Sequence, residues 1–240
     1  MEISAMTDVG RQRKNNEDSY FVYRNDRLSG AMVADGMGGH NAGEIASAMA
    51  TDLIKNCIIS RYNPKMDYME MAELVRAAFN IANNKIFEKA KNKENDGMGT
   101  TATLAFVYDS KLIIAHIGDS RCYKITDDEI CQITNDHSYV GELMRSGMIS
   151  ESDAKTHPNR NMITRAMGAE PGVRVDMEIL PYNGETIVLC SDGLSNMLSD
   201  EQIKNLINTN EDLDYALELM IELANKKGGN DNITVAAIRN

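Results

Sequence analysis

Several features that mark other classes of protein are missing from this sequence of 240 residues. No apolar run is long enough to cross a bilayer. The first residues, Met1 to Ser4, show no basic segment followed by an apolar one, as a signal peptide would require. We therefore expect neither a membrane span nor a signal peptide, and we expect a cytoplasmic protein.

Cysteine and positive charge are also scarce. The four cysteines, Cys57, Cys122, Cys131 and Cys190, are widely spaced and form no CxxC pair, so we interpret them as reduced, buried thiols and expect neither a disulfide framework nor a zinc site. The formal net charge is -11. Nucleic acid and anionic membranes would repel such a chain at long range, so neither is expected as its main partner, whereas cations would be attracted.

The chain does have enough apolar sequence, 42% of its residues, for one large globular domain spanning residues 1–240. Apolar side chains repeat at helical spacing over Ala42–Cys57, where Asn41 and Glu44 resemble a capping box, and again over residues 67–92, 200–208 and 212–226. Short β-rich runs, separated by turn residues, are expected to be strands at residues 2–9, 19–25, 30–34, 100–107, 111–117, 121–126, 129–134, 173–180, 185–190 and 233–238.

The order of these elements predicts an α+β fold, because strands and helices come in groups and do not alternate one by one. Two antiparallel sheets covered by pairs of helices would account for all of them. The four strands between residues 100 and 134 predict an antiparallel meander. Residues 136–170 are polar and irregular, with two candidate short helices, and long irregular segments are often functional.

Aspartates stand beside glycine at the ends of four apolar strands, in Ala34-Asp35-Gly36, Gly118-Asp119, Asp192-Gly193 and Gly228–Asn232, which contains Asp231. One such pair is typical of a turn. Four carboxylates at one rim of a sheet pair would repel one another unless a cation lay among them. An all-oxygen ligand set, to which the exposed carbonyl of Gly36 would add, favours magnesium or manganese over zinc or copper.

A second motif, Arg11 to Asp18, places three cations beside two acids in an otherwise acidic chain. Arginine binds phosphate through two parallel hydrogen bonds. Taken alone, this segment would be interpreted as a solvated loop.

Together these motifs resemble the metal-dependent Ser/Thr protein phosphatases, the PPM or type 2C family, and specifically its compact bacterial members. The resemblance covers nearly the whole chain, in order and in spacing. The matching motifs are Thr7-Asp8-Val9-Gly10 with Arg13, Asn16-Glu17-Asp18-Ser19, Val33-Ala34-Asp35-Gly36-Met37-Gly38-Gly39, Gly99-Thr100-Thr101, Ile117-Gly118-Asp119-Ser120-Arg121, Asp136-His137-Ser138, Ser191-Asp192-Gly193-Leu194 and Asp231-Asn232-Ile233-Thr234.

The resemblance implies a β-sandwich flanked by pairs of antiparallel helices, with a flap at about residues 136–174 beside the site. It implies that Asp35 bridges two ions, Mn2+ or Mg2+, and that the Gly36 carbonyl binds the first of them. Asp192 and Asp231 would complete the coordination of the second ion, and Asp119 with Asp192 would form a third, weaker metal site.

The remaining site residues are also implied by the resemblance. Asp18, together with Glu17, would act near the metals through bound waters. Arg13 would bind the phosphoryl group, and Arg13, Asp35 and Asp192 would be the catalytic residues. The implied reaction is hydrolysis of phosphoserine and phosphothreonine by a water activated between the metals, without a phosphoenzyme and without a cysteine nucleophile.

One position departs from many animal members of the family, which carry a histidine two residues after the first aspartate, as a proposed general acid. Here Met37 occupies that position. His40 lies three residues further on and could donate the proton, but we favour a role at the entry to the helix, and a metal-bound water could serve instead. We expect His116 to be a core strand residue, and His137 and His157 to be flap residues with structural or substrate roles.

The expected partners are phosphorylated proteins, with a cognate Ser/Thr kinase suggested by the resemblance alone, and a monomer is expected. Two other functions stay open: a catalytically weak phosphoprotein-binding scaffold, or pseudophosphatase, and a plain acidic cation-binding domain. The scaffold is disfavoured because all the expected metal-binding residues and the phosphate-binding Arg13 are present. A plain cation-binding domain would explain neither Arg13 nor the spacing of the glycines. Nothing in the sequence excludes phosphotyrosine or small phosphate esters as substrates.

Overall fold

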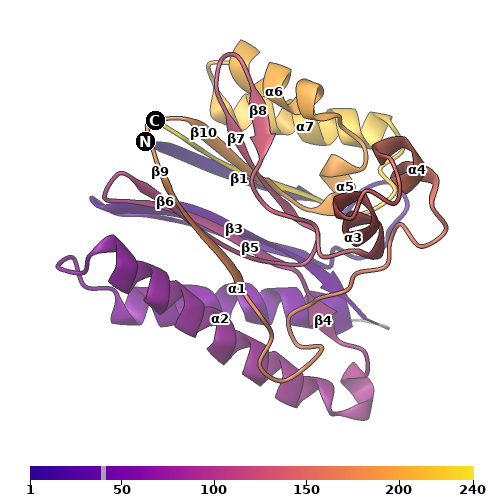
Figure 1. The fold of residues 1–240 in the computed structure, drawn as a ribbon, viewed down its shortest axis with the longest axis horizontal. Coiled ribbons are helices and arrows are strands. Elements are labelled where there is room, and N and C mark those ends of the chain that lie inside the picture. The colour runs from indigo at the N-terminus through magenta and orange to yellow at the C-terminus, as the bar shows by residue number, and fades with distance from the viewer. Residues whose placement is uncertain (39–41) are drawn as a thin grey trace.

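The computed structural model describes residues 1–38 and 42–240. Two antiparallel sheets pack face to face between two pairs of helices (Figure 1), which confirms the predicted fold class. The first sheet has the order β1 (Glu2–Asp8), β11 (Ile233–Arg239), β10 (Thr186–Cys190), β7 (Arg121–Ile125) and β8 (Ile130–Gln132). The second has the order β2 (Asp18–Arg24), β3 (Leu28–Met37), β5 (Ala102–Tyr108), β6 (Lys111–Ile117) and β9 (Asp176–Pro181), and β4 (Gly99–Thr100) pairs with β3.

Helices cover the outer face of each sheet (Figure 1). The second sheet carries α1 (Ala42–Arg61) and α2 (Tyr68–Ala90), and the first carries α6 (Asp200–Thr209) and α7 (Leu213–Lys226). Asp67 caps α2 in a capping box with Glu70. The capping residue expected for the first helix, Asn41, lies outside the described residues. No helix in the described ranges has the length and apolarity of a bilayer span.

The core forms three apolar layers, two beneath the helix pairs and one between the sheets. In β3, Met32 packs on the helix side, whereas Ala31 and Val33 pack on the opposite sheet. Side chains alternate between the faces of a strand, so a strand covered on both faces is apolar at every position. This explains why the central strands are continuous apolar runs in the sequence.

The predicted meander from residue 100 to 134 is wrong. Strands β5 and β6 form a hairpin in the second sheet, whereas β7 and β8 form a hairpin in the first. Both edges of β6 are already taken, by β5 and by β9, so β7 pairs with β10 in the other sheet. The chain changes sheets at Gly118–Ser120, where Gly118 has φ +108°.

The cysteines are only partly as expected. All four are free, and Cys122 and Cys190 are buried. Cys131 is exposed and Cys57 is partly exposed, so the prediction of buried thiols is wrong for these two. Cys131 lies in β8, a three-residue strand at the edge of its sheet, where one face remains open to solvent.

The sheet crossover yields a stability prediction for Gly118→Ala. A Cβ at Gly118 would lie 2.5 Å from Cγ2 of Thr101, and its φ of +108° disfavours any other residue. Gly97 is the matched control, because its φ is +75° with nothing within 4 Å of its Cβ position. Both variants meet a backbone cost of ~1 kcal/mol, and the overlap at Gly118 adds ~1–3 kcal/mol. Urea unfolding should show the larger loss for Gly118→Ala, and equal losses would contradict the packing described.

Candidate metal centre

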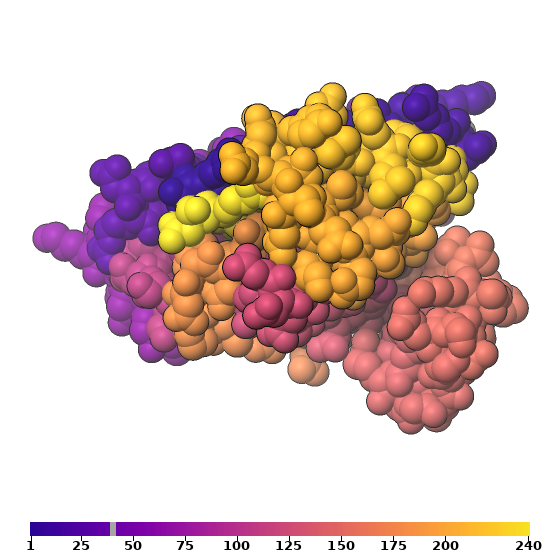
Figure 2. All heavy atoms as spheres, turned by 90° about the horizontal axis from the view of Figure 1, so that it is seen from above, coloured from indigo at the N-terminus to yellow at the C-terminus, as the bar shows by residue number. Residues whose placement is uncertain are grey.

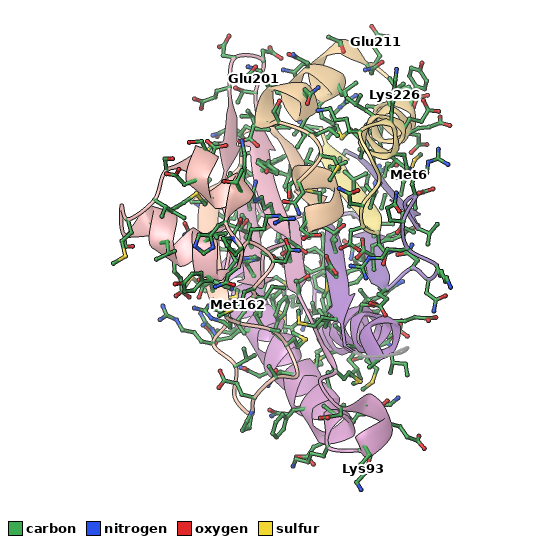
Figure 3. All side chains as sticks on the ribbon, turned by 90° about the vertical axis from the view of Figure 1, so that its right-hand side faces the viewer. Met6, Lys93, Met162, Glu201, Glu211 and Lys226 are labelled. Atoms are coloured by element: carbon green, nitrogen blue, oxygen red, sulfur yellow. The ribbon has the colours of Figure 1, made fainter. Side chains whose placement is uncertain are left out.

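One end of the sandwich gathers the aspartates that the sequence placed at strand ends. Figure 3 faces this end, with Met162 of the flap and Met6 of β1 on opposite sides. Asp18 and Asp35 are partners across the β2–β3 ladder. Burial, and then the charges of Asp18, Asp192, Asp119 and Asp231, raise the pKa of Asp35 well above its ordinary value. We call Asp18, Asp35, Asp119, Asp192 and Asp231 the aspartate cluster.

Asp35 lies within strand β3. The sequence analysis had placed it just after the end of that strand. β3 continues to Met37, because Gly36 pairs with Thr100 of β4. The Asp35 carbonyl accepts hydrogen bonds from Thr101 N and Thr100 Oγ1, each 2.8 Å, and Asp35 N donates to Thr101 Oγ1 at 2.8 Å. A Cβ on Gly36 would lie 2.1 Å from the carbonyl oxygen of a neighbouring backbone, so only glycine fits there.

Asp192 and Asp18 are joined through Ser191. Asp192 begins the short helix α5 (Asp192–Ser195), directly after β10. Ser191 stands at the N-cap but makes no capping bond, because its hydroxyl donates to Asp18 Oδ2 at 2.7 Å and accepts from Thr234 N at 3.0 Å. Asn196 Nδ2 donates to Asp192 Oδ2 at 3.1 Å. The sequence analysis gave Ser191 no role, although it belongs to a quoted motif.

Four carboxyl groups of the aspartate cluster are buried close to one another, which raises their pKa values. Burial, more than the neighbouring acids, raises the pKa of Asp18 to about 7, that of Asp119 to about 8 and that of Asp192 to about 6. Within the described residues, Asp18 Oδ1 and Asp192 Oδ1 are buried without a hydrogen-bond partner. A buried carboxylate oxygen without a donor is suited to binding a cation.

The donor set therefore fits divalent cations that prefer oxygen. Across residues 1–38 and 42–240, no three His, Cys, Asp or Glu side chains converge as ligands of one ion. The cluster fits ions that combine carboxylates with main-chain carbonyls and water, as Mg2+ and Mn2+ do. It does not fit zinc, which prefers a closed set of nitrogen and sulfur ligands.

Arg13 lies at the rim of the aspartate cluster. Its Nη2 donates to Asp231 Oδ2 at 2.8 Å, and half of its side-chain surface is exposed. Asp231 Oδ1 accepts from the backbone N–H of Asn232 at 2.9 Å. The sequence analysis expected Arg13 near the site, and the structure brings it to a predicted metal ligand.

Asn232 is a site residue whose role the sequence analysis missed. Its Oδ1 accepts from Glu17 N at 2.8 Å, and its Nδ2 donates to the carbonyls of Val9 and Asn15, each at 2.9 Å. One buried amide thus fixes both ends of the segment that carries Arg13. The motif Asp231-Asn232 was visible in the sequence, but nothing local shows what a buried amide will contact.

The expected histidines are accounted for in part. His116 is a buried residue of β6, as predicted, and its Nδ1 lies 2.9 Å from Thr103 Oγ1. His137 and His157 lie in the flap, which contains the two short helices α3 (Tyr139–Arg145) and α4 (Glu151–Thr156). His40 lies outside the described residues.

Comparison with known proteins gives the family. The family model of protein phosphatase 2C matches residues 10–234. The chain belongs to this family. This 2C-type phosphatase is 39% identical over 243 residues to protein phosphatase PhpP of Streptococcus pneumoniae, covering 99% of this chain and 97% of that one. It is 38% identical over 241 residues to the serine/threonine phosphatase stp of Listeria innocua, covering 99% of this chain and 95% of that one.

Solved structures of related phosphatases have the same fold as this chain. The serine/threonine phosphatase of Streptococcus agalactiae superimposes with a TM-score of 0.91 at 36% identity, over 98% of each chain. The catalytic domain of the phosphatase PstP, in complex with two manganese ions, superimposes with a TM-score of 0.82 at 35% identity, over 98% of this chain and 96% of that one. This 2C-type phosphatase is accordingly a metal-dependent hydrolase that acts on phosphorylated proteins.

The raised carboxyl pKa values predict how the metal-free phosphatase responds to pH. Burial lowers the pKa of His116 and His137, so these two histidines bind protons mainly in the unfolded state, and their opposing contribution ends by about pH 7.5. Above that pH, Asp119 and to a smaller extent Asp18 still hold protons in the folded state that they have lost in the unfolded one. Stability therefore falls as the pH rises from about 7.5 to 8.5, by about 1.4 kcal/mol per pH unit for each proton of difference.

Urea unfolding in chelator across this range tests the prediction. Added Mn2+ should flatten the slope, because it stabilises the ionised carboxylates. Stability in chelator that is constant or rises over this range would contradict the electrostatics described.

Proposed function

We propose that this chain hydrolyses phosphoserine and phosphothreonine in proteins at the aspartate cluster, with Mn2+ or Mg2+ as its cofactor. The observation that carries this proposal is the combination of buried, mutually repelling carboxyls with orphaned oxygens and an arginine at their rim. The buried carboxyls require cations to offset their charge, and the arginine suits a phosphoryl group. The names of the relatives, which include serine/threonine phosphatases of Listeria and Streptococcus, support the choice of substrate.

The assignment of metal ligands extends this proposal. Asp35 would be shared by two ions, with the Gly36 carbonyl as a ligand of the first and Asp192 and Asp231 as ligands of the second. The two manganese ions bound to PstP support a pair of core ions. Asp119 with Asp192 holds a third, weaker ion, and Asp18 acts through water, in keeping with its place between Ser191 and Asp35.

The chemistry divides between the cations and the chain. When bound, the cations supply a water of lowered pKa and offset the charge of the phosphate. Arg13 binds the phosphoryl oxygens, and its ion pair with Asp231 orients the guanidinium before the substrate arrives. Asp35 and Asp192 remain ionised and fix the relative position of cations and phosphate.

The partners proposed for this activity are proteins phosphorylated by a Ser/Thr kinase, and the phosphatase acts as a monomer. No observation favours the scaffold or the plain cation-binding domain. Arg13, Asp35, Asp192 and Asp231 are all present at one end of the fold, and relatives of nearly full length are named phosphatases.

Asp192→Asn tests the metal assignment. We expect kcat on a phosphothreonine peptide to fall about 100-fold or more, and Mn2+ binding measured by calorimetry to weaken. Stability in chelator should not fall, because the variant removes one of several repelling charges and little volume. Asp127→Asn, at an exposed turn, is the matched control and should behave as the wild type. Full activity of Asp192→Asn would refute the assignment.

Arg13→Ala tests phosphate binding. We expect kcat/KM for the phosphothreonine peptide to fall about 100-fold, and Arg13→Lys to restore only part of it, because lysine cannot form the two parallel bonds. Arg11→Ala removes the same charge from the same loop and should have a small effect. An unchanged kcat/KM in Arg13→Ala would overturn this role.

A further inference from the structure

Strand β2 forms an open edge of the second sheet. Across residues 1–38 and 42–240 it pairs with β3 on one side and with no strand on the other. Proteins usually shield such an edge, because its unpaired N–H and C=O groups can bind another extended chain. The N-terminal segment that contains β2, in indigo, reaches the margin of the molecule on the side away from the salmon-coloured flap (Figure 2).

Every second residue of β2 directs its backbone groups to this open edge. Gly36 N donates to the Glu17 carbonyl at 3.0 Å, so the residues at odd positions of the strand bond to β3. The backbone N–H and C=O groups of Tyr20, Val22 and Arg24 therefore point outward. Within the described residues these outward groups have no hydrogen-bond partner.

The side chains of the same three residues are exposed beside the edge. Phe21 packs beneath the helices, so its neighbours along the strand face the other way. Tyr20 is 37% exposed and Val22 is 38% exposed. Arg24 is exposed as well, and none of the ion pairs among the described residues includes it. Two apolar side chains and an unpaired cation thus follow one another along the edge.

The open edge also leads to the aspartate cluster. Asp18 is the first residue of β2, and Arg24 is the last, ~20 Å away at the rise of an antiparallel strand. Asp18 N already donates to Asn16 Oδ1 at 3.1 Å, so pairing along the edge would end at Tyr20, ~7 Å from Asp18. Of the strands at the sheet edges in the described part of the chain, only β2 contributes a residue to the cluster.

We propose that the edge of β2 is a docking site for the substrate protein, which adds an extended segment there as an antiparallel strand. The inference rests on the proposed function, because it concerns the substrate of that site. The pairs of this sheet are antiparallel, and antiparallel pairing is slightly more stable than parallel pairing. A strand antiparallel to β2 runs from Arg24 towards Asp18, so the docked residues precede the phosphorylated one.

The register predicts which substrate residues are recognised. With the phosphorylated residue opposite Asp18, the residues two and four positions before it lie opposite Tyr20 and Val22, on the same face, where apolar side chains are favoured. The residue six positions before it lies opposite Arg24, where a carboxylate is favoured. Main-chain hydrogen bonds supply the affinity in this kind of recognition, and alternate side chains supply the specificity.

Two phosphothreonine peptides of equal length measure the docking. One extends the chain only before the phosphothreonine, with the predicted apolar and acidic residues, and the other extends it only after. We expect kcat/KM with Mn2+ to be about tenfold higher for the first peptide, mainly through KM, because a few added hydrogen bonds each contribute modestly.

N-methylation of the first peptide supplies a matched control that leaves the enzyme unchanged. The amides two and four positions before the phosphothreonine face β2, so their methylation should abolish the gain. The amides three and five positions before it face away, and their methylation should have little effect.

Val22→Pro blocks the edge on the enzyme. Proline removes the outward N–H of Val22 but no hydrogen bond to β3, and edge strands tolerate it. We expect kcat/KM for the first peptide to fall about tenfold, whereas turnover of p-nitrophenyl phosphate stays unchanged. Val22→Ala keeps the N–H and should retain most of the preference. Arg24→Glu should lose part of it, and a lysine in place of the acidic residue of the peptide should restore that part.

Equal kcat/KM for the two peptides in the wild type would overturn the inference and leave the proposed function standing, because both peptides would still be hydrolysed. So would equal effects of methylation at the facing and the outward amides, a result that decides the matter even if Val22→Pro fails to fold. Dimerisation that Val22→Pro abolishes, without any preference between the peptides, would assign the edge to a second copy of this chain. A wild type that hydrolyses neither peptide with Mn2+ would overturn both the inference and the proposed function.

Discussion

Repulsion among buried carboxylates is the interaction on which the rest of this structure depends. Asp18, Asp35, Asp119 and Asp192 have raised pKa values because they are buried beside one another. A protein of net charge -11 gains nothing in stability from such a cluster unless cations bind there. The packing of the two sheets therefore keeps these acids close together in spite of their mutual repulsion.

The acids come together because each one is brought to the same end of the sandwich by a different strand or turn. β3 brings Asp35, the crossover after β6 brings Asp119, the turn after β10 brings Asp192 and the turn before β11 brings Asp231. Short hydrogen bonds from buried neutral groups hold the turns that carry them. Ser191, Thr101 and Asn232 supply those groups. Ser191 and Asn232 tie the two sheets to one another at the site end, and Thr101 holds Asp35 within its own sheet.

Much of this could be predicted from the sequence, because apolar periodicity and the aspartate–glycine pairs are local features. The helix pairs, most strands, the short flap helices and the acids of the site were all predicted. The assignment of residues 100–134 to one meander failed because strand pairing is decided by which edges remain free, and β9 occupies the free edge of β6 from some 60 positions further along the chain. The role of Asn232 was invisible for the same reason, since its partners Val9, Asn15 and Glu17 are distant in sequence.

The most direct test of this account is hydrolysis of a phosphothreonine peptide and of p-nitrophenyl phosphate, in chelator and then with Mn2+ or Mg2+ added back. The account predicts turnover of the peptide that is lost in chelator and restored by the metal. Turnover that persists in chelator would contradict it. So would tight Mn2+ binding without turnover under any metal, a result that would instead favour a phosphoprotein-binding scaffold.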